Sequence, residues 1–316
     1  MAVSIIAFVL ARFVDHAGDL VLMILLIAIF AALEWMFPAE RSQTIRGRVR
    51  NLEFMAIFQL GGGIFVSLVA YVVLPHLLLP SEAIPDRSPL ERAGLIVFFI
   101  FLGDAVFYWY HRAQHSVAWL WVIHELHHSD SELNATSSLR TYLLERPIQF
   151  LAISLPIAVL ISRTPGLDKL SLTADEASTS YVVSLTWLFF AHANLRLQLG
   201  RLSWIGTAPQ VHRIHHSIEA GHQQKNFAQF FPVLDVAFRT YCAPRRGEFP
   251  RTGPEGAPAR SPLAHVLLEP LRHWLRPVFG PTTSPLEDVR AAPASKEGAC
   301  VCEGERAYSA SSQTRR

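Results

Sequence analysis

Three histidine clusters at helical spacing constrain this chain more than any other feature of its sequence. On an α-helix, residues three and four apart share one face, so each cluster can aim its imidazoles at a common point. Burying this many imidazoles without a common partner would cost about 1–3 kcal/mol for each unsatisfied nitrogen. The clusters therefore predict a metal site. They read His111-Arg-Ala-Gln-His115, His124-Glu-Leu-His127-His128 and His212-Arg-Ile-His215-His216, with His192 alone between the second and third.

The number of clustered histidines sets the number of metal ions. A tetrahedral ion takes four ligands and an octahedral ion six, so eight or nine imidazoles exceed what one ion accepts. Two metal ions are therefore expected. The predicted ligands are His111, His115, His124, His127, His128, His192, His212, His215 and His216.

Composition indicates a membrane protein. The chain of 316 residues is 51% hydrophobic and 17% charged, whereas soluble domains carry about 25% charged residues. Its net charge of +2 is too small for a nucleic-acid-binding surface, and no basic run lies beside aromatic stacking residues. We therefore expect a membrane and no nucleic acid as partners.

Apolar runs separated by polar loops predict an all-α, multi-pass helix bundle. The first runs cover residues 19–37 and 54–79, and a third starts near residue 93 and leads into the first histidine cluster. Residues 147–162 and 177–191 are shorter runs, which either cross the bilayer or form a re-entrant pair.

The arginines predict the orientation of the bundle. If the basic loop at 38–53 is cytoplasmic, the following two spans bring every histidine cluster out on the cytoplasmic side as well. In a bacterium this corresponds to the cell inner membrane, with the site at its cytoplasmic face.

Two polar residues precede the first cluster on the same helical face. Asp104 and Tyr108 stand seven and three residues before His111. An acid inside an apolar helix normally faces a partner. We expect Asp104 to orient a ligand imidazole, with a carboxylate that bonds a neighbouring helix as the alternative.

The clusters resemble the HxxxH, HxxHH and HxxHH boxes of the fatty acid hydroxylase and sterol desaturase superfamily. His192-Ala-Asn194 before the third box and Asn226-Phe227 after it agree with this pattern, over about residues 93–242. Residues 140–145 read Arg-Thr-Tyr-Leu-Leu-Glu where the family has Arg-x-His-Pro-Leu-Glu, a departure that concerns the substrate more than the metals.

The resemblance implies a membrane helix bundle with a cytosolic helical cap that holds two iron ions. These irons would use O2 to hydroxylate or desaturate a lipid, with the nine histidines as their ligands. It further implies that Asn194 or Asn226 binds through water. Only a redox-active ion can use O2 on an unactivated C–H bond, which agrees with iron.

The electron donor must be a separate protein, because the chain has no dinucleotide, haem or flavin motif. We expect a reductase acting through a ferredoxin or a cytochrome b5-like carrier. The predicted domains are 1–92 (N-terminal transmembrane helices), 93–242 (the hydroxylase-like catalytic domain), 243–280 (a linker and an interfacial amphipathic helix) and 281–316 (a disordered tail).

Two other functions fit part of the pattern. His124-Glu125-Leu-His127-His128 also contains H-E-x-x-H, which in an intramembrane zinc protease would place Glu125 as general base. That alternative leaves the first and third clusters unexplained. A metal carrier is the other alternative, but its ligands would lie near mid-membrane, whereas these clusters stand at the ends of the apolar runs.

Overall fold

The computed structural model describes residues 2–57, 62–77, 86–197, 199–245, 247–253, 268 and 270–275. Within these residues the chain is helical, and its β-pairing is one isolated antiparallel bridge between Ser217 and Thr252. The predicted all-α class is therefore confirmed for the described part. The tail predicted at 281–316 lies outside the described residues.

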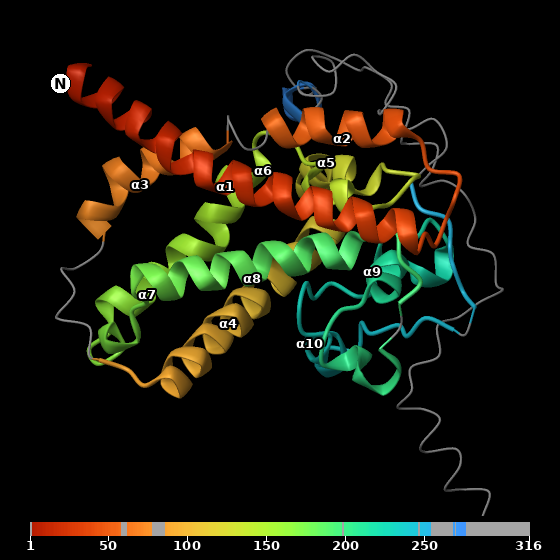
Figure 1. Ribbon diagram of the computed structural model, residues 1–316. Helices are drawn as coiled ribbons and strands as arrows, with labels where there is room; N and C mark the ends of the chain where they lie inside the picture. The colour runs from red at the N-terminus through yellow and green to blue at the C-terminus, as the bar shows by residue number, and fades with distance from the viewer. Residues whose placement is uncertain are drawn as a thin grey trace, which may run out of the picture.

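Figure 1 shows α1 lying along α8, with α4 crossing α8 on its other side, while α9 and α10 gather near one end of these helices. The main helices are α1 (Ala2–Met36), α2 (Ile45–Ile57), α3 (Gly63–Leu77), α4 (Pro89–Ser116), α5 (Ala118–His128), α6 (Glu145–Gln149), α7 (Leu155–Arg163), α8 (Ala174–His192), α9 (Pro209–His215) and α10 (Val233–Ala237). Shorter elements are η2 (Ala135–Leu139), η3 (Phe150–Ser154), η4 (Asp168–Leu170), η5 (Gly200–Trp204) and η6 (Ala220–His222).

Among the residues that the structure describes, two helical stretches are long and apolar enough to cross a membrane by length and composition. One is α4, and the other runs over Glu145–Arg163, where α6, a π-helical turn in η3 and α7 follow one another. The apolar stretches Leu20–Met36 and Gly63–Leu74 are shorter.

The apolar run expected at 54–79 includes residues 58–61 and 78–79, which lie outside the described residues. Helix α2 ends at Ile57 and α3 begins at Gly63, next to three consecutive glycines, which have low helix propensity. A side chain at Gly62 would meet the Cβ of Arg146 at 3.0 Å. The glycine thus permits close approach to α6.

Helix α4 begins at a complete capping box and runs without a break into the first histidine cluster. The Ser88 hydroxyl accepts from the Glu91 amide, and the Glu91 carboxylate accepts from the Ser88 amide. These bonds satisfy N–H groups that a helix start leaves free. The continuous helix keeps Asp104, Tyr108 and His111 buried on one face.

The core beside the histidines joins α1, α8 and η2. Phe30 of α1 stacks on Phe189 of α8 with ring centroids 6.2 Å apart. Leu139 of η2 belongs to the same buried cluster. Because Phe189 precedes His192 by less than one turn, this packing fixes the end of α8 that carries His192.

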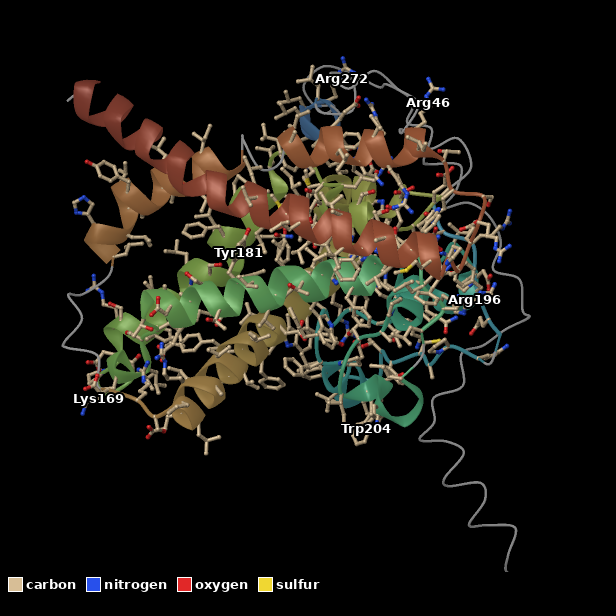
Figure 2. All side chains as sticks on the ribbon, viewed as in Figure 1. Arg46, Lys169, Tyr181, Arg196, Trp204 and Arg272 are labelled. Carbon is tan, nitrogen blue, oxygen red and sulfur yellow. The ribbon has the colours of Figure 1, made fainter. Side chains whose placement is uncertain are left out.

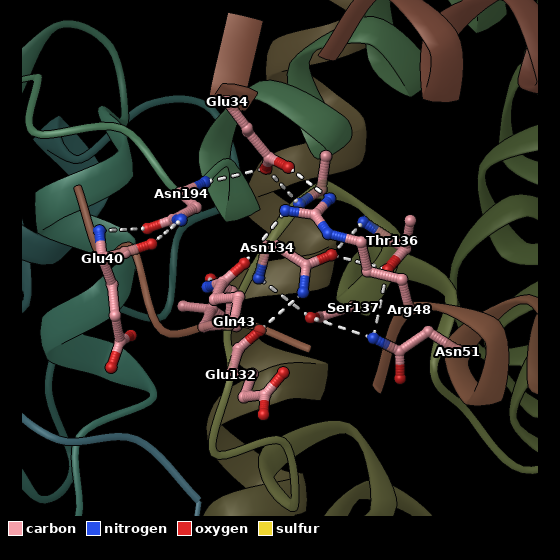
Figure 3. Close-up of polar contacts among 12 residues, drawn as sticks. Glu34, Glu40, Gln43, Arg48, Asn51, Glu132, Asn134, Thr136, Ser137 and Asn194 are labelled. Atoms are coloured by element: carbon pink, nitrogen blue, oxygen red, sulfur yellow. Dashed lines mark hydrogen bonds and ion pairs between the residues drawn. The ribbon is translucent and has the colours of Figure 1, made fainter. Parts of the chain in front are cut away.

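A buried carboxylate ties four segments together at that end. Figure 3 shows Glu34 between Asn194 and Arg48. Its Oε1 accepts from the amides of Asn194 and Ala135, each at 2.8 Å, and its Oε2 accepts from the Arg48 guanidinium at 2.6 Å. The last turn of α1 is therefore bound to α2, to η2 and to the chain that follows His192.

Candidate metal centre

The nine predicted ligands come together in two groups of histidines. Within each group, one nitrogen from every imidazole lies within 4.8 Å of the others. All nine side chains are buried or half-buried. The first group contains His111, His115, His124, His128 and His215, and the second contains His127, His192, His212 and His216.

Four helices position these side chains. Helix α4 carries the first cluster, α5 the second and α8 ends at His192. Helix α9 begins with Pro209, which suits the first turn of a helix, and carries the third cluster. The second and third clusters both divide between the groups. His127 lies with His192 and not with His124 and His128. In the third cluster, His215 joins the first group, while His212 and His216 join the second.

Hydrogen bonds at Nδ1 fix the tautomers of four imidazoles. His111 donates to the carbonyl of Phe227, His192 to Leu188 and His215 to Lys225 at 2.8–2.9 Å. His124 donates to Glu145 Oε1 at 3.1 Å. In each ring the neutral form then keeps a lone pair on Nε2, the nitrogen available to a metal.

The free lone pairs face one another. His111 Nε2 lies 3.0 Å from His124 Nε2, although both rings already carry their proton on Nδ1. Two lone pairs at this distance repel unless a cation lies between them. His115 Nε2 and His215 Nε2 are also buried without a hydrogen-bond partner. The donor set of the first group therefore fits a bound metal ion.

The second group has the same crowding. His192 Nε2 lies 3.1 Å from His127 Nε2 and 3.0 Å from His212 Nε2. His212 Nε2 in turn lies 3.1 Å from His216 Nε2. Four imidazole nitrogens thus converge on one point, which fits a second metal ion.

Burial keeps these imidazoles neutral. Removal from water holds the pKa of His124, His127, His128, His212 and His216 well below the ordinary value. Burial lowers the pKa of His215 to about 4, against a smaller opposing effect of the Lys225 carbonyl. Neutral imidazole is the form that binds metals.

Two carboxylates hold the backbone that orients His111. Asp235 accepts from the amides of Phe227 and Ala228 at 2.7 and 2.9 Å. Asp104 accepts from the next three amides, residues 229–231, at 2.7–3.0 Å. Five consecutive N–H groups are thus bonded to two side chains, and the Phe227 carbonyl is held against His111.

Asp104 was predicted either to orient an imidazole or to bond a neighbouring helix. Its hydrogen bonds go to the backbone amides of residues 229–231. Its effect on His111 therefore passes through the chain near Phe227. Tyr108 lies on the same face and its hydroxyl is 2.8 Å from Thr240 Oγ1.

The two asparagines also bond to the backbone. Asn194 accepts from the Glu40 amide and donates to the Glu40 carbonyl. Asn226 donates to the carbonyls of Val211 and Cys242. Asn226 has φ of 57°, a left-handed conformation that asparagine tolerates. A water-mediated role at a metal stays a prediction for both residues.

Sequence reasoning did not assign Glu145 to the site. Its carboxylate is buried and Oε1 accepts from Gln114 at 2.9 Å as well as from His124. One sequence feature could have identified it: Glu145 matches the final glutamate of the Arg-x-His-Pro-Leu-Glu motif with which residues 140–145 were compared. Carboxylates that bond a metal-binding histidine raise its basicity and fix its orientation.

A third, smaller group contains Glu219, His222 and Glu248. His222 Nδ1 is bonded to Ser217 Oγ at 2.9 Å, and its Nε2 lies 3.4 Å from Glu248. These contacts give both ring nitrogens of His222 a protein partner.

The fold and the two histidine groups define a helical protein built around a buried, histidine-rich centre. Residues 96–240 match the model of the fatty acid hydroxylase family. This part of the chain matches the family model, and the resemblance seen in the histidine boxes is confirmed over these residues.

Known relatives are lipid-oxidising enzymes. The chain is 25% identical to the ornithine lipid hydroxylase OlsE of Rhizobium tropici over 85% of its own length and 81% of the relative. It is 31% identical to the alkylglycerol monooxygenase of Homo sapiens and 30% to that of Xenopus tropicalis, over 45% of this chain. The match spans 30% and 29% of those two relatives. No solved structure matches the chain.

Proposed function

We propose that this protein is a membrane-bound di-iron oxygenase that hydroxylates a lipid with O2 and externally supplied electrons. The observation that carries the proposal is the convergence of nine imidazoles in two groups, with free lone pairs facing one another. The relatives, which are named as lipid hydroxylases or monooxygenases, support the same reaction class.

The number of imidazoles in the first group favours iron over zinc. Its five imidazoles exceed the four ligands of a tetrahedral zinc. A five- or six-coordinate ion such as iron would accept them all.

The nine histidines would hold two irons, five imidazoles for one and four for the other. When bound, the irons would supply the activation of O2 and the oxidation of a C–H bond. Hydroxylation converts C–H, O2, two electrons and two protons into C–OH and water. The electrons would come from a separate reductase through a ferredoxin or a cytochrome b5-like carrier.

The chain's own residues prepare the site for this reaction. Four imidazoles donate hydrogen bonds from Nδ1, so that each Nε2 faces inward. The acceptors are the carbonyls of Phe227, Lys225 and Leu188 and the carboxylate of Glu145. Burial excludes water and keeps the imidazoles unprotonated. Apolar helices beside the site would admit the lipid directly from the bilayer.

We place the protein as a multi-pass integral membrane protein with a cytosolic helical cap. The apolar α4 and the helix Glu145–Arg163 support membrane insertion. The basic loop at 38–53 supports a cytoplasmic location of the site, because positive residues are retained on that side. For a bacterial protein this is the inner membrane.

The zinc protease has less support. His124 and His128 belong to the group that also contains His111, His115 and His215. A zincin leaves its zinc with two helix histidines and one further ligand plus water, and so does not need five imidazoles. Glu125→Gln would abolish a protease and should leave an oxygenase with both metals.

Lipid profiling tests the proposed function. Membranes from cells that express the chain should contain a lipid heavier by one oxygen than in cells expressing a His111→Ala, His216→Ala variant. A lipid lighter by two hydrogens would instead mean desaturation. Purified protein should carry two irons per chain. Identical lipid profiles, or zinc at one atom per chain, would overturn the proposal.

A further inference from the structure

Exposed apolar side chains cluster around α10. Val233, Val236 and Phe238 are 38–45% exposed, and they form what we call the α10 patch. Leu202 and Trp204 of η5 are exposed as well, and Figure 2 shows Trp204 at the lower edge of the molecule. Contiguous apolar surface on this scale normally covers or contacts something.

The α10 patch continues the exposed face of α4. The ring of Phe238 packs against Trp109 with centroids 4.7 Å apart, and Phe231 packs against Phe101 at 5.4 Å. Trp109 and Phe101 are themselves 51% and 39% exposed. One apolar surface therefore runs from the candidate membrane-spanning helix onto the segment that follows the third histidine cluster.

The length of α4 indicates how deep its residues would lie in a bilayer. From Pro89 to Trp109 the helix measures about 30 Å, which is about the thickness of a bilayer's hydrocarbon core. The Arg112 guanidinium lies 5.5 Å from the Trp109 ring, and tryptophan with arginine is typical of the membrane–water boundary. Phe101 lies about 12 Å from Trp109 along the axis, on the lipid side.

The backbone amides of the segment that ends at Phe231 are hydrogen-bonded within the protein, as burial in lipid requires. A non-helical chain is excluded from lipid unless its N–H groups find partners within the protein. Asp104 and Asp235 accept from all five amides of residues 227–231. The position of Asp104 inside an apolar helix is explained by this requirement.

We propose that residues 231–238 lie in the bilayer at the cytoplasmic boundary, with the α10 patch inserted among the lipid acyl chains. Arg112 and the exposed Arg239 would then meet the lipid phosphates. The occupant of the α10 patch is the phospholipid bilayer itself. The inference rests on the membrane placement in the proposed function.

Site-specific photo-crosslinking tests the inference on the full chain in native membranes. Val236 is replaced by the photoreactive p-benzoylphenylalanine, and lipid adducts on the irradiated protein are counted by mass spectrometry. Val97 of α4, which is 55% exposed, receives the same substitution as the lipid-facing reference. Gln223, which is exposed near η6, is the water-facing reference.

We expect lipid adducts at Val236 and Val97 at least about tenfold above those at Gln223. Adducts at Val97 with none at Val236 would overturn the inference and leave the proposed function intact. No adducts at either valine would overturn both membrane placements. A crosslink from Val236 to a second copy of the chain would assign the α10 patch to an oligomer interface instead. Val233→p-benzoylphenylalanine serves if the Val236 variant loses its metals.

Discussion

The hydrogen bond at one nitrogen of an imidazole determines what its other nitrogen can do. His124 is the histidine whose Nδ1 contacts a carboxylate, while His111, His192 and His215 contact carbonyls. A negative partner makes an imidazole a stronger ligand and favours a more oxidised metal. The group with five histidines should therefore hold its ion more tightly.

Glu145→Gln tests this difference. Glutamine retains an oxygen that can accept from His124 but removes the negative charge. We expect the first group to lose affinity for its metal by about 10- to 100-fold, while the second group is unchanged. Metal release to a chelator, followed by elemental analysis, measures both. Glu53→Gln, at an exposed carboxylate, should behave as the unmodified protein, and equal release from both groups would contradict the assignment.

The division of the histidines predicts a selective loss of metal. His216→Ala leaves the second group with three imidazoles and the first with all five. We expect the purified protein to fall from two metal atoms per chain to about one, because three neutral ligands hold an ion less well than four. His222→Ala, outside both groups, is the matched control. Retention of two metals by His216→Ala would show that the groups are wrongly drawn.

At the scale of elements, residues 227–231 are docked on α4 by Asp104 and on the start of α10 by Asp235. The bonds of Asp104 join segments that are more than a hundred residues apart in the sequence. Helix periodicity predicts that Asp104 and His111 share a face. It does not predict which distant segment packs against that face.

Asp104→Asn should weaken this docking. Asparagine has one acceptor oxygen where the carboxylate has two, and it loses the charge that strengthens bonds to three amides. We expect a loss of about 2–3 kcal/mol in stability and a reduced metal content in the first group. Thermal unfolding in detergent measures the first effect. Asp175→Asn, whose side chain is 90% exposed, should leave the unfolding temperature within error of the parent, and an equal fall in both variants would contradict the account.

Over the whole molecule, the buried imidazoles make stability depend on pH. His215 has a pKa of about 4 when folded and about 6.5 when unfolded. Between these values the unfolded chain binds the proton and the folded chain does not, so stability falls as pH falls. Each such imidazole contributes about 1.4 kcal/mol per pH unit over this window.

Metal-free protein should therefore unfold at progressively lower temperature from pH 6.5 toward pH 4. Because the buried imidazoles of α5 and of the third cluster contribute in the same direction, the decline should be steep, and the transition at pH 5 should lie well below that at pH 7. Differential scanning fluorimetry in detergent across this range measures it. An unfolding temperature that is constant between pH 7 and pH 5 would mean that the histidines are protonated or exposed in the folded chain.

The nine histidines could be predicted as ligands from the sequence because residue type and helical spacing are local properties. The same residues could not reveal that the second and third clusters split between two groups, since this depends on how α5, α8 and α9 meet. Glu145 was missed for the same reason, because His124 and Glu145 approach only after α6 has packed.

The participation of α9 in both groups has a consequence for biogenesis. The first group lacks His215, and the second lacks His212 and His216, until the chain has been synthesised through α9. A ribosome stalled before residue 209 would expose four imidazoles of one set and two of the other, and neither set would be closed. Neither metal site would therefore be complete before α9 has emerged.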